Sequence, residues 1–216
     1  MKTLIKPKKP RLKRGEQKEI RTQELLDATW ELFCEVGYDA VTIDKVAELA
    51  GYSRKPIYTL FGDKQSLFFE MWSRKFAELV ELTLSLLDPK LTLRANLRRL
   101  AEVAADRGNQ GENQRGESLL FVMQTITLGR QDLAARARKL FEESVKGFAQ
   151  AIKRCPLERG QRLRSNPELV AAHLMAHIGG LSRLEYQTGR NYMHAQDLYE
   201  LFVYMAIVSG PEAIVR

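Results

Sequence analysis

Apolar residues recur every three or four positions through nearly all of the 216 residues, and this spacing constrains the fold more than any other feature. It gives a helix one apolar face, whereas a half-buried strand would alternate apolar and polar residues. No alternating stretch and no internal repeat stands out. The sequence therefore predicts an all-α protein with about nine helices, over residues 17–36, 43–50, 54–61, 64–87, 93–106, 117–128, 131–154, 167–187 and 195–208.

The residues between these segments are typical of helix ends. Thr42, Ser53 and Asn166 each precede a segment and are suitable N-caps, since their side chains can accept a bond from a free backbone N–H. Gly37 follows the first segment, where a left-handed cap is favoured. The polar stretch 108–116 predicts a loop between two helices.

Positive charge is concentrated at the N-terminus. Residues 1–21 hold nine Lys or Arg and two acids, which accounts for the entire net charge of +7. Pro7 and Pro10 disfavour an ordered helix before about Gly15. A basic flexible arm over residues 1–16 suits a polyanion, because each neutralised phosphate releases counterions. By itself it fits nucleic acid, a membrane surface or a solubilising tail.

The cysteines, the hydropathy and the motifs of the chain favour a cytoplasmic protein and argue against a membrane protein and an enzyme. The two cysteines, Cys34 and Cys155, suggest no disulfide framework and favour a reducing cytoplasm. No apolar run approaches the roughly 18 residues of a membrane helix, so no membrane partner is expected. No phosphate-binding loop, nucleophile elbow or paired-carboxylate pattern is present, which argues against an enzyme.

Two short segments, 43–50 and 54–61, are separated by a turn with glycine at the bend. This is the sequence form of a helix-turn-helix, in which the second helix presents polar and basic groups to the major groove. That helix opens with Ser53-Arg54-Lys55-Pro56 and buries an apolar inner face. The motif can also be a mere packing arrangement, but the basic outer face favours DNA.

Residues 21–68 resemble the N-terminal domain of the TetR/AcrR family of transcriptional regulators. The shared pattern is an apolar first helix, a Gly-Tyr pair, a threonine opening the second helix, a glycine turn and a lysine opening the fourth helix. The matching residues are Leu32-Phe33, Gly37-Tyr38, Thr42, Ala50-Gly51-Tyr52-Ser53, Tyr58, Phe61 and Lys64. Pro56 and Leu60 depart from the family pattern, so the operator sequence is not predicted.

The resemblance implies roles for particular residues. Thr42, Tyr58 and Lys64 would bind phosphates, and Arg54 and Lys55 would face base edges, where arginine pairs with guanine. Three further groups would add to this DNA-binding set. Ser53 caps the recognition helix, the ring of Pro56 would touch a thymine methyl, and Lys13 and Arg14 of the arm would reach along the backbone. Residues 17–63 would form the DNA-binding domain.

Residues 64–216 would then bind an effector and dimerise. In this family the last two long helices form the dimer interface, which would here involve Leu174, Ile178, Leu181, Leu198, Phe202 and Met205. Candidate pocket residues, which favour an apolar or aromatic effector, are Trp72, Phe76, Phe121, Met123, Gln124 and Phe148. An ordinary intramolecular core is the minor alternative for the dimer residues, whereas for the pocket residues it is the simpler interpretation.

No cofactor or metal is expected. His173 and His177 share a helix face, but no acid or cysteine accompanies them at a ligand spacing. Three functions remain: a repressor released from a palindromic operator by a small effector, a DNA-binding regulator or activator controlled by a partner protein, and an enzyme. The first is favoured.

Overall fold

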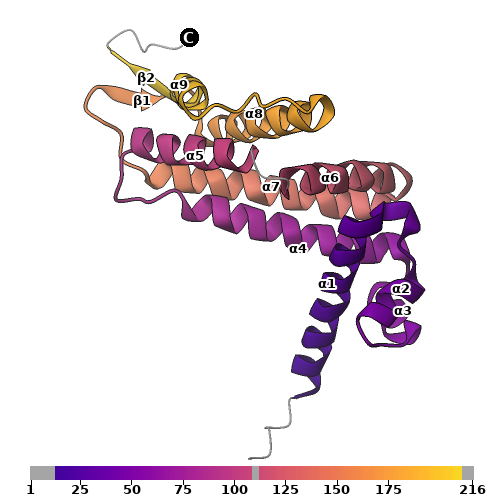
Figure 1. Ribbon diagram of the computed structural model, residues 1–216. Coiled ribbons are helices and arrows are strands. Elements are labelled where there is room, and N and C mark those ends of the chain that lie inside the picture. The colour runs from indigo at the N-terminus through magenta and orange to yellow at the C-terminus, as the bar shows by residue number, and fades with distance from the viewer. Residues whose placement is uncertain (1–12, 109–111, 211–216) are drawn as a thin grey trace, which may run out of the picture. The chain divides into compact units, whose positions relative to one another are not determined.

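The computed structural model describes residues 13–108 and 112–210, and this part of the chain is almost entirely helical (Figure 1). Its helices are α1 (Arg14–Ala40), α2 (Ile43–Leu49), α3 (Arg54–Phe61), α4 (Lys64–Ser85), α5 (Leu93–Gly108), α6 (Glu112–Gly129), α7 (Gln131–Arg154), α8 (Pro167–Thr188) and α9 (Ala195–Ala206). The prediction of an all-α fold with about nine helices is confirmed.

Two short strands were not predicted. β1 (Gln161–Leu163) and β2 (Ile207–Ser209) pair antiparallel, with Arg162 opposite Val208. Each strand has three residues, too few for alternation to register as a pattern. The β-branched pair Ile207-Val208 explains why α9 ends at Ala206 rather than at residue 208.

The predicted loop over residues 108–116 was also wrong in part, because α6 begins at Glu112. Residues 109–111 lie outside the described part of the chain. Gly116 costs only about 1 kcal/mol in a helix relative to alanine. A helix that buries Leu119, Met123 and Ile126 further along can tolerate that cost.

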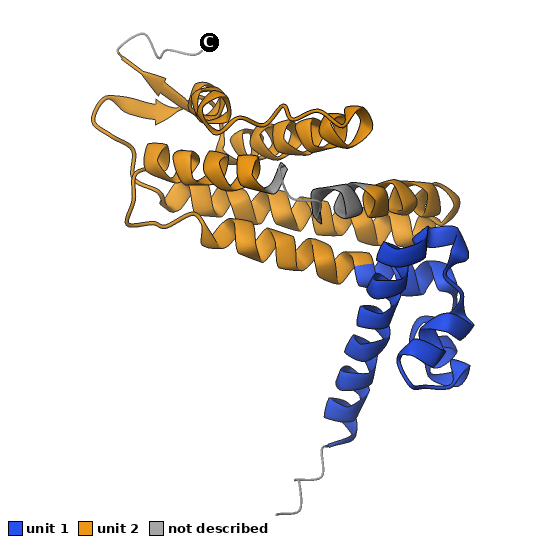
Figure 2. Cartoon of the chain, in the orientation of Figure 1, with its two compact units in different colours: residues 1–71 blue, residues 72–216 orange. Residues whose placement is uncertain are grey.

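The chain forms two compact units, residues 1–71 and residues 72–216 (Figure 2). In the second unit α5 packs chiefly against α9, and α7 against α8. Their facing side chains form one hydrophobic core, in which Leu93, Leu97, Val170 and Phe202 are completely buried. The first unit has its own core and carries the candidate site.

Candidate nucleic-acid interface

The core of the first unit holds α1, α2, α3 and the start of α4 together. Leu25, Val46, Ile57 and Phe68 are fully buried, one from each helix. The ring of Phe33 meets that of Phe68 edge-on, with centroids 6.0 Å apart. Because these apolar faces point inward, the opposite faces of α2 and α3 are available to a partner.

The turn between α2 and α3 depends on glycine. Gly51 has a φ of +72°, which side chains other than glycine rarely adopt. Around it, the Tyr52 N–H donates to the Ala47 carbonyl at 2.8 Å. At the other end of α2, Thr42 caps the helix as predicted, accepting a bond from the Lys45 N–H at 3.2 Å.

The opening of α3 is exposed. Ser53, Arg54 and Lys55 are open to solvent, while Pro56 is half-buried. Ser53 occupies the N-cap position, but its side chain makes no capping bond, so that part of the prediction was wrong. Its hydroxyl therefore faces solvent without a backbone partner in the first turn of α3.

Tyr58 is also exposed, with 53% of its surface accessible. A tyrosine at the edge of the core would lie mostly buried. One turn before it, Arg54 forms an ion pair with Asp44 of α2, and both side chains are more than half exposed, at 65% and 57%. The pair draws the guanidinium of α3 toward α2 across the outer surface.

Lys64 makes contacts inside the first unit that the resemblance does not imply. Its ammonium donates a hydrogen bond to the Tyr38 carbonyl at 2.7 Å and lies 4.2 Å from the centroid of the Tyr38 ring. Burial lowers the pKa of Lys64 from its ordinary value, although Asp39 acts in the opposite direction. Lys64 thus already has a structural role between α4 and the end of α1.

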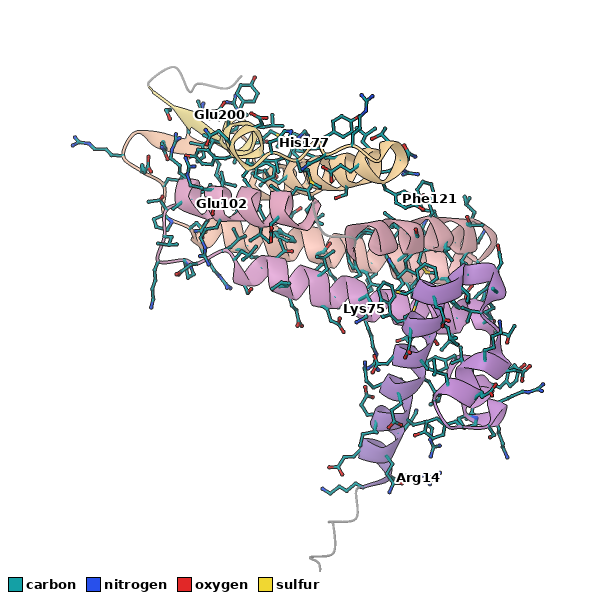
Figure 3. The ribbon with its side chains drawn as sticks, in the orientation of Figure 1. Arg14, Lys75, Glu102, Phe121, His177 and Glu200 are labelled. Atoms are coloured by element: carbon teal, nitrogen blue, oxygen red, sulfur yellow. The ribbon has the colours of Figure 1, made fainter. Side chains whose placement is uncertain are left out.

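The two predicted residues of the basic arm that are described lie at the start of α1. The helix begins at Arg14 (Figure 3), three residues earlier than expected, and Lys13 is its N-cap residue. Both are exposed, and the Lys13 N–H donates to the Glu16 carboxylate at 2.7 Å. The rest of the predicted arm, residues 1–12, lies outside the described residues.

Three residues of this surface were missed by the sequence analysis. Asp44 neutralises Arg54, Tyr38 holds Lys64, and the Tyr52 hydroxyl donates to the Glu24 carboxylate of α1. That last bond raises the pKa of Tyr52 above its ordinary value. Tyr38 and Tyr52 are among the residues that match the TetR/AcrR pattern, but their hydrogen-bond partners were not predicted. Those partners are distant in sequence, so no rule based on spacing pairs them.

In the second unit, the predicted pocket residues separate into different environments. Trp72 stacks on Phe76 with ring centroids 5.4 Å apart, and Phe141 of α7 contacts both rings. Phe148 and Met123 are buried, and Phe148 belongs to the core with α5, α8 and α9. That the six residues line one pocket stays a prediction.

The other two predicted pocket residues meet α8 instead. Phe121 of α6 (Figure 3) lies beside Tyr186, with ring centroids 6.1 Å apart. The guanidinium of Arg183 lies 4.4 Å from the centroid of the Phe121 ring and donates to the Gln124 amide oxygen at 3.4 Å. These contacts join α6 to α8.

The predicted dimer-interface residues point inward. Leu174, Leu198 and Phe202 are buried in the core of their own unit, and Ile178, Leu181 and Met205 pack against that core. For Leu174, Leu198 and Phe202, burial in their own unit corrects the prediction of a contact surface. Ile178, Leu181 and Met205 are half-buried, and their contact with a partner stays a prediction.

Other expectations concern metals and membranes. His173 is exposed, whereas His177 is half-buried and edge-on to Phe202 at a centroid distance of 6.5 Å. Within residues 13–108 and 112–210, no three side chains of a metal-ligating type gather. In the same residues, no helix has both the length and the hydrophobicity needed to cross a bilayer.

Comparison with known proteins now adds to this geometry. Residues 25–71 match the family model described as bacterial regulatory proteins of the tetR family. The chain is 33% identical over 79 residues to YhgD, an uncharacterized HTH-type transcriptional regulator of Bacillus subtilis. It is 32% identical over 68 residues to AcnR, an HTH-type transcriptional repressor of Corynebacterium glutamicum.

These sequence matches are partial. They cover 37% and 32% of this chain, and they span only 41% and 36% of the length of the two relatives. The likeness to curated proteins is therefore confined to about a third of the molecule.

Similarity to solved structures covers most of the chain. A proposed TetR-family regulator from Mesorhizobium loti has a TM-score of 0.71 at 20% identity, over 89% of this chain and 99% of that one. NalD, the secondary repressor of an efflux pump in Pseudomonas aeruginosa, has a TM-score of 0.57 at 20% identity, over 89% and 98%. The matched residues 25–71 include the helix-turn-helix, so this part of the chain is similar to the bacterial regulatory proteins of the tetR family, and the solved structures show the same fold.

Proposed function

We propose that the chain is a sequence-specific transcriptional regulator that binds a palindromic DNA operator as a homodimer. One observation carries this proposal: Arg54, Lys55 and Tyr58 stand exposed on α3, while Ile57 of the same helix is fully buried. A helix fixed by its inner face and basic on its outer face suits insertion into the major groove. DNA as the partner also implies the cytoplasm as the compartment.

The contacts divide by type. Arg54 and Lys55, with the ring of Pro56, would meet base edges, and an arginine can bind guanine through two hydrogen bonds. The hydroxyl groups of Thr42, Ser53 and Tyr58 would donate hydrogen bonds to phosphates. Such contacts set the register of the protein on the duplex. Lys64 would have a spare N–H for a phosphate beyond the bond that it makes to Tyr38.

Lys13, Arg14 and the remainder of the arm, residues 1–16, would extend the contact along the duplex. Arg14 is the first residue of α1 and is exposed. A chain rich in basic residues beside a helix-turn-helix can follow the phosphates or enter the minor groove. The proposal assigns the arm to affinity and the α3 surface to specificity.

A homodimer is proposed because one recognition helix reads too few base pairs for a unique site. Exposed rather than buried positions of α8 and α9 would form the interface. On α8, Leu169, His173, Ala176, Gly180 and Leu184 are all exposed and follow one another at helical spacing. A side chain at Gly180 would meet nothing within 4 Å of its Cβ, so a second helix can approach closely.

Residues 64–216 are proposed to hold the effector site as well. The stacked rings of Trp72 and Phe76 with Phe141 favour an apolar or aromatic effector between α4 and α7. The helix α4 runs from Lys64 to Ser85, so it is the chain segment that joins the two units. An effector preferring the non-binding conformation would shift the population away from DNA and relieve repression.

One observation favours the second candidate, a regulator controlled by a partner protein. Phe148 and Met123 are both buried, and Phe148 belongs to the hydrophobic core of the second unit, as expected for a unit packed without a ligand site. Titration with aromatic and apolar compounds, followed by tryptophan fluorescence, separates the two. A saturable change in fluorescence that is accompanied by loss of DNA binding supports a regulator controlled by a small effector. If no compound changes the fluorescence or the DNA binding, a regulator controlled by a partner protein is supported. No catalytic role is proposed in either case.

The DNA proposal is tested by selecting bound fragments from genomic DNA with wild-type protein and with Arg54→Ala. We expect wild type to enrich fragments that share a twofold-symmetric sequence. Arg54→Ala should lose about 1–3 kcal/mol of discrimination at one position of each half-site. Identical enrichment by both proteins, or no shared symmetric sequence, would refute the proposed role of α3.

A further inference from the structure

A groove of about 340 Å³ lies on the second unit, away from the aromatic residues just described. Its walls come from the first turns of α5, from Tyr199 of α9 and from Glu158 in the segment after α7. We call it the α5–α9 groove. Its volume falls at the lower end of the range for small-molecule sites, roughly 300–1,000 Å³.

The α5–α9 groove is rich in arginine. Arg94, Arg98 and Arg99 line it from one helix, against two carboxylates, Glu102 (Figure 3) and Glu158. The formal charge of this lining is therefore positive. Arg94 and Ala95 of this lining stand in the first turn of α5, where the helix dipole adds further positive potential.

Two of the guanidinium groups are held by neighbours on other elements. Arg94 lies with its Nε 3.5 Å from a Glu158 carboxylate oxygen, and its Nη1 is 3.5 Å from the Tyr199 hydroxyl. The guanidinium carbon of Arg98 lies 3.9 Å from the centroid of the Tyr199 ring. One tyrosine therefore orients both arginines, and less conformational entropy is lost when a ligand binds.

Arg99, the third arginine of the groove, has N–H donors available for a ligand. Arg99 is half-buried and forms no ion pair within residues 13–108 and 112–210. The ion pair of Arg94 is long and half exposed, at 36% and 44%, so it is weak. Guanidinium groups present paired N–H donors that match the two oxygens of a carboxylate or phosphate.

We propose that the α5–α9 groove binds a small molecule through one carboxylate or phosphate group held by Arg94, Arg98 and Arg99. The oxyanion takes the donors of Arg99 and competes with Glu158 for Arg94. The methyl groups of Ala95 and Thr92 border the same groove and leave room for a short carbon skeleton. This binding is independent of the proposed DNA contacts, and it is measured without DNA.

The test follows arginine Nε–H resonances of the full-length protein by NMR. Inorganic phosphate and succinate are titrated separately, with sodium chloride at matched ionic strength as the reference. We expect saturable shifts confined to Arg94, Arg98 and Arg99 for one or both probes. Saturation by phosphate alone identifies a phosphate ligand, and saturation by succinate alone identifies a carboxylate. Shifts spread over all arginines without saturation overturn the proposal.

Three variants sharpen the test, and each must first show a wild-type melting curve. Arg99→Gln should weaken binding about five- to tenfold, because it removes a charged hydrogen-bond donor. Arg138→Gln, on the exposed surface of α7, removes the same charge elsewhere and should change binding less than about twofold. Equal effects of these two variants overturn the proposal.

Glu158→Gln should act in the opposite direction. It removes the carboxylate that competes for Arg94 while keeping the shape of the side chain, so binding should tighten about two- to fivefold. Weaker or unchanged binding in this variant contradicts the competition. If Arg99→Gln fails to fold, Glu158→Gln and the wild-type shifts decide the outcome by themselves.

Discussion

Replacing Asp44 by asparagine should strengthen DNA binding, since Asp44 holds the arginine proposed to read the bases. In the free protein Arg54 is paired with Asp44, and both side chains are more than half exposed, at 65% and 57%. Such exposed pairs contribute about 0.2–1 kcal/mol. Arg54 must leave Asp44 before it can contact the bases, so the free energy of the ion pair opposes DNA binding. Asp44→Asn removes this opposing free energy.

The carboxylate also repels the duplex. A unit charge roughly 8 Å from a phosphate contributes about 0.5 kcal/mol in water, which screening at physiological salt lowers to about 0.2 kcal/mol. With the ion pair the total is about 0.4–1.2 kcal/mol for each protomer of the proposed dimer, a two- to eightfold gain in affinity per half-site. Fluorescence anisotropy with a labelled operator duplex at 150 mM salt can measure it.

A double-mutant cycle separates the two contributions. In an Arg54→Ala background, Asp44→Asn should gain only about 1.4-fold, since repulsion alone remains. Glu48→Gln is a matched control, because it removes the same charge from an exposed position of α2 and leaves Arg54 paired. It should also gain about 1.4-fold.

The result that refutes this reasoning is an equal gain from Asp44→Asn in both backgrounds, or no gain at all. Stability must be followed in parallel. Asp44 lies in the first turn of α2, where an acid stabilises the helix by about 0.3–1 kcal/mol. A lower Tm is therefore expected, and the binding assay should be run well below it.

The other predictions concern separate parts of the molecule. Tyr58→Phe should weaken binding to operator and scrambled duplex alike, about fivefold in competition anisotropy, with no change in Tm. Lys64→Met should lower Tm by calorimetry and reduce the slope of log affinity against log salt by about one unit. An unchanged slope would restrict Lys64 to its structural role. Leu184→Glu should convert the proposed dimer to monomer in light scattering. Leu79→Glu is the control and should not, although Leu79 is as exposed as Leu184, at 46% against 47%. Deleting residues 1–12 should weaken binding several-fold at low salt, and unchanged affinity would exclude a contact by that segment.

The start of α2 and the turn before α3 were predictable because they depend on local chemistry, whereas both ends of α1 differ from the prediction. Thr42 and Gly51 act within four residues of their own positions, as a cap and as the bend of a turn. Ser53 shows the limit of such rules, since a residue type suited to capping took the N-cap position without making the bond. Local propensity fixes where a helix starts more firmly than which bonds form there.

Contacts between elements were much less accessible from the sequence. Leu174 and Phe202 were assigned to a partner, but they belong to the core, because spacing shows an apolar face without showing what covers it. The pairing of Arg54 with Asp44 spans a turn between two helices, and no periodicity predicts it. The α5–α9 groove exists only because α9 brings Tyr199 to the arginines of α5.

Photo-crosslinking from position 55 tests most directly whether α3 enters the groove of DNA. A benzophenone amino acid replaces the exposed Lys55, and the same replacement at Leu79 of α4 serves as the reference. We predict crosslinks to the selected duplex at two positions related by twofold symmetry, about one helical turn or a multiple of it apart. Crosslinks from position 79 equal to those from position 55, or none from position 55, would contradict the account.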